Sequence, residues 1–127
     1  MEYVYLVIVL VLIEYIALGG LVSRARGQYG IKAPAVTGHA VFERTFRVQQ
    51  NTLEGLVVFV PALWLFGAYL NPLVAAALGV VGIIGRAIYA RAYIKDPDTR
   101  GRGATICGMV NVVLLLGGLV GLIRALL

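Results

Sequence analysis

The sequence predicts an all-α integral membrane protein whose four transmembrane helices form a bundle. Of its 127 residues, 61% are hydrophobic and only 13% are charged, which is typical of membrane proteins and not of soluble globular ones. Four apolar stretches are each long enough to cross a bilayer core, which takes about 20 helical residues. Ten of the eleven Lys and Arg residues lie in two clusters, at 24–47 and 86–102.

The elements follow one another in a simple order. We expect a single domain, 1–127, with helices at about 3–22, 44–70, 73–93 and 104–127. The connection at 23–42 contains three glycines and a proline, which oppose a continuous helix. The Asn71-Pro72 pair forms an uncharged tight turn, so the second and third helices form a hairpin. The first 22 residues lack the basic n-region of a secretory signal peptide, so we interpret them as a retained first helix.

The charge distribution predicts the orientation of the chain. The first and third loops carry the Lys and Arg residues, whereas the second loop carries none. By the positive-inside rule both basic loops are cytoplasmic, and both termini lie on the opposite side of what we take to be a bacterial inner membrane. Arg124, near the C-terminus, argues weakly in the other direction. We expect no nucleic-acid partner, because little soluble chain remains to present a binding surface.

Small residues recur along the third helix, at 75, 79, 82 and 85, and along the fourth, at 117 and 121. In membranes such residues let helices approach closely, so we expect tight packing there. Cys107 lies in an apolar run and is expected to be a small buried hydrophobe. The single His39 has no second His or Cys beside it, so we expect no metal site.

Two polar clusters interrupt the apolar pattern. The helix-two cluster comprises Arg47, Gln49, Gln50, Asn51 and Glu54, of which the first, fourth and fifth share one helical face. The helix-three cluster comprises Arg86, Tyr89 and Tyr93, which share one face of the third helix, and Arg100 follows shortly after it. Both clusters lie at the cytoplasmic ends of their helices, so we expect them to meet at one depth.

Charges within a membrane helix need a partner or a ligand. A structural Glu54–Arg86 salt bridge would satisfy both residues without any function, and the residues alone leave this alternative level with a ligand site. Glu14, which interrupts the first helix, is expected to be paired or protonated, not catalytic. As a ligand site, the clusters offer Arg for carboxylates, Glu for an ammonium group, and amides and hydroxyls for hydrogen bonds. This set suits a small zwitterionic, peptide-like molecule.

The segments FERTFRVQQNTLE, GRAIYARAY and DPDTRGRG closely resemble the MAPEG family, the membrane-associated proteins in eicosanoid and glutathione metabolism. The resemblance covers about residues 44–104 by motif and the flanking helices by hydropathy. The last segment resembles the microsomal glutathione transferase branch most, in its bacterial form. Two positions depart from the family pattern: Gly55 stands where several members carry Tyr, which removes a possible hydrogen bond to glutathione, and Ala92 stands where Gly is usual.

The resemblance implies a homotrimer in the lipid membrane, with glutathione bound as co-substrate between neighbouring subunits. It implies a glutathione transferase that acts on hydrophobic or lipid-like electrophiles, with glutathione peroxidase activity as a further expectation and no metal. Arg100 matches the arginine that is credited with stabilising the glutathione thiolate. The other implied glutathione-binding residues are Arg26, Arg47, Gln49, Asn51, Glu54, Arg86, Tyr89 and Tyr93.

Two alternatives stay open beside the enzyme. The first is a non-catalytic membrane protein of the same fold that binds glutathione or a lipid, because a fold and a motif do not guarantee turnover. The second is a small structural helix bundle with buried ion pairs.

Overall fold

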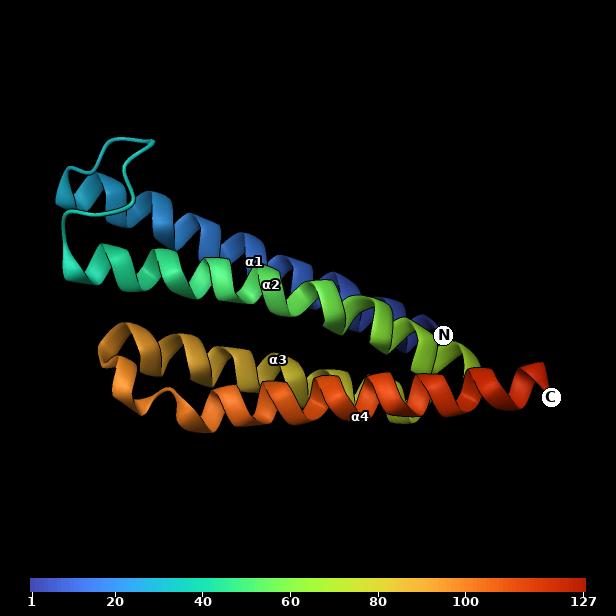
Figure 1. Cartoon of the computed structure of the whole chain (residues 1–127). Coiled ribbons are helices and arrows are strands. Elements are labelled where there is room, and N and C mark those ends of the chain that lie inside the picture. The colour runs from blue at the N-terminus through green and yellow to red at the C-terminus, as the bar shows by residue number, and fades with distance from the viewer.

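The computed structural model describes residues 1–127 as four long α-helices and one short 3-10 helix (Figure 1). The elements are α1 (Glu2–Tyr29), α2 (Ala40–Tyr69), α3 (Pro72–Lys95), η1 (Pro97–Thr99) and α4 (Gly101–Leu126). Each long helix is long and apolar enough to cross a membrane. The predicted class, an all-helical chain with four candidate spans, is therefore confirmed.

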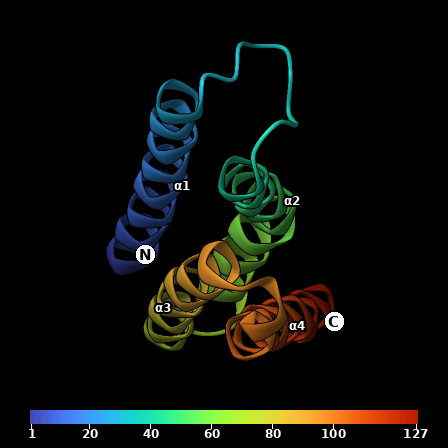
Figure 2. The ribbon, with the colours of Figure 1, turned by 90° about the vertical axis from the view of Figure 1, so that its left-hand side faces the viewer.

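Successive helices run in opposite directions. Both termini and the α2–α3 turn lie at one end of the bundle, and the α1–α2 connection and η1 lie at the other (Figure 1). Below, these are called the terminal end and the loop end. α2 and α3 contact each other and each packs against both α1 and α4. At the loop end α1 and α4 lie apart (Figure 2). The two central helices therefore hold the bundle together.

The expected bounds of the first connection were wrong. The α1 helix continues through Tyr29, and α2 begins at Ala40, so residues 30–39 alone lie outside the helices and not the predicted 23–42. The helix ends at Gly30, whose φ of 65° is left-handed and whose N–H bonds the carbonyl of Arg26. Gly27 alone does not stop a helix, because a single interior glycine costs only about 1 kcal/mol.

The α2–α3 hairpin has the tight turn that the sequence predicted. The Asn71 side chain accepts hydrogen bonds from the N–H groups of Leu73 and Val74, at 2.9 and 3.0 Å. Pro72 occupies the first turn of α3, where its missing N–H costs nothing. An N-cap directly followed by proline is a strong start signal, which is why this boundary could be predicted closely.

The main hydrophobic core lies in the half of the bundle nearer the terminal end. Its largest fully buried side chains come from three helices: Val4 and Val11 from α1, Phe59 and Leu63 from α2, and Leu114 from α4. Nearer the loop end, the buried apolar residues form two smaller clusters. The polar residues of both sequence clusters therefore lie where apolar packing is thinner.

Tight packing at the small residues is confirmed, and two glycines show how close the backbones come. A Cβ on Gly103 would overlap the backbone of Tyr89, where α4 crosses α3. A Cβ on Gly121 would lie 2.6 Å from the carbonyl oxygen of Tyr69, where α4 meets the end of α2. Both neighbouring groups are backbone atoms, so neither contact can be relieved by a side-chain rotation.

Replacing Gly121 with Ala should therefore destabilise the bundle by about 1–3 kcal/mol, the usual cost of overpacking, although Ala is the better helix former. Gly20→Ala is the matched control, because nothing lies within 4 Å of a Cβ there. Thermal unfolding in detergent should show a lower midpoint for Gly121→Ala and an equal or higher one for Gly20→Ala. Equal midpoints for both variants would contradict this account of the α2–α4 contact.

Candidate functional site

The helix-two and helix-three clusters meet, as their common depth predicted. The side-chain amide of Asn51 on α2 donates a hydrogen bond of 2.6 Å to the hydroxyl of Tyr89 on α3. The rings of Tyr89 and Tyr93 lie 5.6 Å apart between centroids, with an angle of 45° between their planes. These three residues form a polar contact between the two central helices on the loop side of the core.

Arg86 lies in the interior of the subunit. Its side chain is only 5% exposed, and it is the one buried Lys or Arg in the chain. The guanidinium carbon lies 4.9 Å from the centroid of the Phe59 ring, a cation–π distance. Its Nε and Nη2 atoms are buried without a hydrogen-bond partner. Such a group is costly unless something else satisfies it.

Gly55 explains how this guanidinium fits against α2. A Cβ at this position would lie 2.7 Å from Nη1 of Arg86 and 3.3 Å from Nη2. Any larger residue would force the guanidinium to move. The glycine at the position where family members often carry Tyr therefore makes room for Arg86 in this chain.

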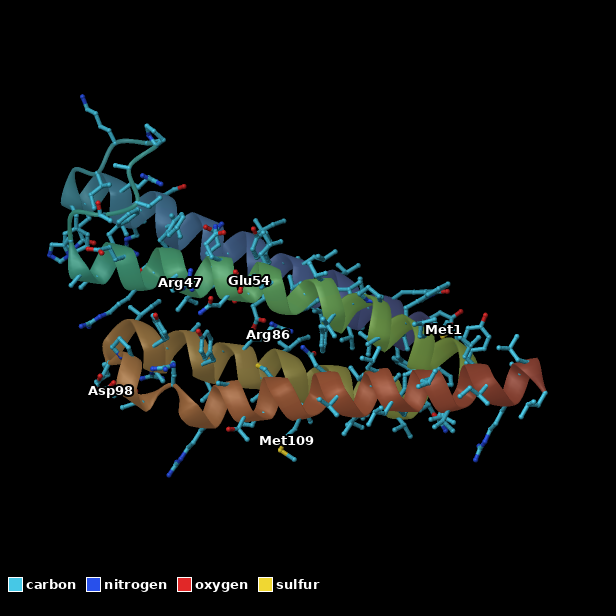
Figure 3. All side chains as sticks on the ribbon, viewed as in Figure 1. Met1, Arg47, Glu54, Arg86, Asp98 and Met109 are labelled. Carbon is cyan, nitrogen blue, oxygen red and sulfur yellow. The ribbon has the colours of Figure 1, made fainter.

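The structural salt bridge between Glu54 and Arg86 is not formed within the subunit. The one ion pair in the chain joins the N-terminal amine to Glu2. Glu54 is exposed on α2, whereas Arg86 lies inside the bundle (Figure 3). Adjacent residues on a helix point about 100° apart, so Gly55 can face Arg86 while Glu54 faces away from it. This alternative is therefore wrong for the single subunit.

The other members of the helix-two cluster divide between two sides of α2. Arg47 is exposed and its side chain makes no hydrogen bond. Gln49 is half-buried and faces α1, since a Cβ on Gly19 would lie 3.1 Å from its Nε2 atom. Side chains two residues apart on a helix point about 200° apart, so Gln49 and Asn51 face opposite neighbours. One subunit does not bring these two amides together.

The two predicted arginines outside these helices make contacts of their own. The Nη1 atom of Arg26 donates to the carbonyl of Ala35 at 2.7 Å, and the guanidinium lies 4.8 Å from the Phe42 ring. It thus ties the α1–α2 connection to both helices. Arg100 is exposed between η1 and α4, and its Nη1 atom donates to the carbonyl of Pro97 at 2.8 Å. Within one subunit neither arginine hydrogen-bonds to Asn51 or Tyr89.

A cavity of about 210 Å³ opens between α2, α3 and α4 beside Arg86. Two residues of the helix-three cluster, Arg86 and Tyr89, line this cavity. Its lining residues are Asn51, Thr52, Gly55, Arg86, Tyr89, Ala104, Cys107, Gly108 and Asn111. Polar side chains from three helices therefore reach a cavity whose walls are otherwise largely apolar.

Two of the polar residues around Arg86 were not among the predicted site residues. Asn111 lines the cavity from α4, and Glu14 projects from α1; each has a buried oxygen atom without a hydrogen-bond partner. The sequence carried a signal for both, because each is a polar residue inside an apolar span. The expectation that Cys107 is a plain buried hydrophobe was incomplete, since it is part-buried and lines the same cavity.

The arrangement can bind an anionic group deep in the subunit and a zwitterion nearer its surface. Arg86 offers free N–H donors, and the hydroxyl of Tyr89, whose oxygen accepts from Asn51, has its own O–H left to donate. Arg47 and Glu54 present opposite charges on the exposed side of α2. No group of His, Cys, Asp and Glu residues is placed to hold a metal ion.

The MAPEG family model matches residues 4–123. This chain belongs to the MAPEG family. The family resemblance seen in its motifs is thereby confirmed, and family membership together with four apolar helices makes it an integral membrane protein.

Three relatives illustrate its place in the family. An uncharacterized protein of Synechocystis sp. is 42% identical over 109 residues, which cover 86% of this chain and 80% of the relative. Human microsomal glutathione S-transferase 2 is 40% identical over 99 residues, covering 77% of this chain and 67% of the human protein. The bovine microsomal glutathione S-transferase 2 is 36% identical over 106 residues, covering 84% and 73%.

Proposed function

We propose that this MAPEG protein is a membrane-bound glutathione transferase that conjugates glutathione to hydrophobic electrophiles. The observation that carries the proposal is its 40% identity to a microsomal glutathione S-transferase over 77% of the chain. The single domain, 1–127, contains both polar clusters, and the structure supports the proposal by bringing Asn51 and Tyr89 into contact. Glutathione is the co-substrate, and the chemistry requires no metal.

The charges of the two clusters complement those of glutathione, which carries two carboxylates and one ammonium group. Arg47 and Arg86 would bind carboxylates, since charge-assisted hydrogen bonds to Arg are the strong ones. Glu54 would bind the ammonium group. The amides of Gln49 and Asn51 and the hydroxyls of Tyr89 and Tyr93 would bind the peptide groups, because amides and hydroxyls both donate and accept hydrogen bonds.

A homotrimer would complete the site at the contact between subunits. Arg47 and Glu54 are exposed in one subunit, and Gln49 faces away from Asn51. A ligand held by all of them must therefore be covered on its outer side by another chain. Gln49 would then be supplied by the neighbour of the subunit that supplies Asn51, because the two amides face opposite sides of α2.

The chemical step is attack by the glutathione sulfur on an electrophilic carbon of the second substrate. A carbon–sulfur bond forms as the leaving group departs with its electron pair, or as an activated double bond accepts that pair. A thiol with a pKa of about 8.5 is mostly protonated at neutral pH. Arg100 would stabilise the thiolate and so raise the population of the nucleophile. The hydrophobic substrate would arrive from the surrounding lipid.

A second candidate function is binding of glutathione or a lipid without turnover. Two observations favour it: Arg100 donates to Pro97 in its own loop, and Gly55 removes a possible hydrogen bond to glutathione. Peroxidase activity, in which the thiolate reduces a lipid hydroperoxide, would use the same thiolate and would therefore also depend on Arg100. Turnover of a generic electrophile separates the enzyme from the binding protein.

The proposed orientation places the loop end in the cytoplasm. Single cysteines at Gln28, Asp98 and Leu127, all exposed positions, can be introduced in a Cys107→Ser background. A membrane-impermeant thiol reagent should label positions 28 and 98 from the cytoplasmic side and position 127 from the other side, because the two ends of the bundle lie on opposite membrane faces. Labelling of positions 28 and 127 from the same side would contradict four complete spans.

Arg47→Ala and Glu54→Ala should each weaken glutathione binding at least about tenfold, which is about 1.4 kcal/mol, because each removes a charge that faces an opposite charge of the ligand. Calorimetry on variants that native mass spectrometry shows to be trimers is the measurement. Arg91→Ala is the control, since Arg91 is exposed and lies off the site face of α3. If both variants bind glutathione with wild-type affinity, the helix-two cluster is not part of the site. If native mass spectrometry finds the wild-type protein to be a monomer, a site shared between subunits is excluded.

Arg100→Ala should lower turnover far more than it weakens glutathione binding, because the side chain acts on the thiolate and not on the carboxylates. The ultraviolet absorbance of the bound thiolate should titrate at higher pH in the variant, by one pKa unit for each 1.4 kcal/mol of lost stabilisation. Arg102→Ala, exposed two residues later, is the control. If neither the titration nor the turnover changes, Arg100 does not stabilise the thiolate and is only a loop arginine.

A further inference from the structure

Glu14 and Arg86 occupy unusual positions in this chain. Glu14 is the one acidic residue of six that is not exposed, and Arg86 is the one basic residue that is buried. They come from α1 and α3, which pack against each other. The sequence places them 72 residues apart, so only the fold makes them neighbours.

Both residues lie deep in the apolar part of the bundle. Arg86 is nine residues from Lys95 at the end of α3, which is about 13 Å along the helix axis. Glu14 is fifteen residues from Tyr29 at the end of α1, or about 22 Å. Neither side chain can place its charge in water at such a depth, so each requires compensation within the protein.

Each group has unused hydrogen-bonding capacity. One carboxylate oxygen of Glu14 and two guanidinium nitrogens of Arg86 are buried without a partner. The two groups do not form a direct ion pair. They lie at one level of the α1–α3 contact: a Cβ on Gly79 would lie 2.5 Å from Cγ1 of Val7, and Arg86 and Glu14 each follow two turns later on the same face of their helices, which run in the same direction. The cavity beside Arg86 reaches Asn111, whose oxygen is also unpaired.

The other neighbours of Arg86 fix it only in part. Phe59 supports one face of the guanidinium, and Gly55 leaves room for Nη1. Neither accepts a hydrogen bond, so neither sets the direction in which the N–H groups point. The one acidic side chain that is not exposed, Glu14, belongs to α1.

We propose that Glu14 is a positioning residue: from α1 it supplies the counter-charge that directs the guanidinium of Arg86 toward the cavity between α2, α3 and α4. Arg86 touches the ligand, and Glu14 acts only through Arg86. The proposal deepens the proposed function and rests on it, because the ligand that Arg86 would receive is a carboxylate of glutathione. It also links α1 to the cavity, whose lining residues come from the other three long helices.

The first measurement concerns Arg86 itself and needs no ligand. In protein labelled with ¹³C,¹⁵N-arginine, the Nε–H signal of Arg86 is identified by its loss in Arg86→Lys. Glu14→Gln keeps the shape of the side chain and removes its charge, so the Arg86 signal should shift and its exchange with water should rise at least about tenfold. Glu2→Gln, an exposed acid on the same helix, should leave the signal unchanged.

The second measurement concerns the ligand. Glutathione affinity by calorimetry should fall at least about tenfold in Glu14→Gln, recover in part in Glu14→Asp, and stay at the wild-type value in Glu2→Gln. Recovery by Asp is the readout that separates a counter-charge from a residue needed only for packing. If Glu14→Gln does not assemble, Glu14→Asp alone decides, with a smaller shift of the Arg86 signal and a smaller loss of affinity.

Two outcomes would overturn the inference. In the first, Glu14→Gln lowers the unfolding temperature but leaves the Arg86 signal and the affinity unchanged, which would make Glu14 purely structural. In the second, the signal changes while the affinity does not, which would leave a pair without a role in binding. If the wild-type protein binds no glutathione, the proposed function fails, and the Arg86 signal in Glu14→Gln still decides whether Glu14 positions Arg86.

Discussion

The buried guanidinium of Arg86 is the constraint on which the arrangement of this bundle depends. Insertion scales put the cost of an Arg at the centre of a membrane helix at about 2.5–3.5 kcal/mol, which is a large fraction of the stability of a small domain. The chain accommodates it with an aromatic face at Phe59 and a glycine at position 55, and the one acidic residue that is not exposed, Glu14, lies on the neighbouring helix α1. Hydrophobic residues alone would have packed this space at lower cost, so a polar interior points to a functional need.

The distribution of apolar packing follows from the same constraint. The main core fills the terminal half of the bundle, where α1, α2 and α4 contribute large buried side chains. Glycines let α4 approach α2 and α3 closely, as at Gly121 and Gly103. Toward the loop end the packing is thinner and polar side chains take its place. The well-packed half thus supports the half that carries the proposed site.

The subunit by itself holds only part of the proposed site. Arg86, Tyr89 and Asn51 are brought together inside it, whereas Arg47 and Glu54 face outward and Arg26 and Arg100 hold their own loops. Charged residues that remain exposed at the edge of an apolar helix bundle suit a contact with another chain. The proposed trimer is the simplest arrangement that would gather these groups around one ligand.

The sequence by itself determined the class, the number of spans, the α2–α3 turn and the meeting of the two polar clusters. These depend on local signals: a run of apolar residues, an Asn-Pro start, and the spacing of polar residues along one helix. The sequence also named Arg86 and Tyr89 as site residues, because polar side chains in apolar spans are rare. It did not fix the end of α1, because helix propensity in residues 23–29 outweighed one glycine.

Only the tertiary structure decided which charges face each other. Glu54 and Arg86 were plausible partners by depth, but the rotation of α2 about its axis turns Gly55 toward Arg86 and Glu54 away. The acidic residue at the level of Arg86 in the α1–α3 contact is instead Glu14, from a helix whose rotation the sequence does not reveal. Depth in a membrane can be counted along the chain, whereas the facing of two helices depends on how all their side chains pack. That physical difference separates what could be predicted here from what could not.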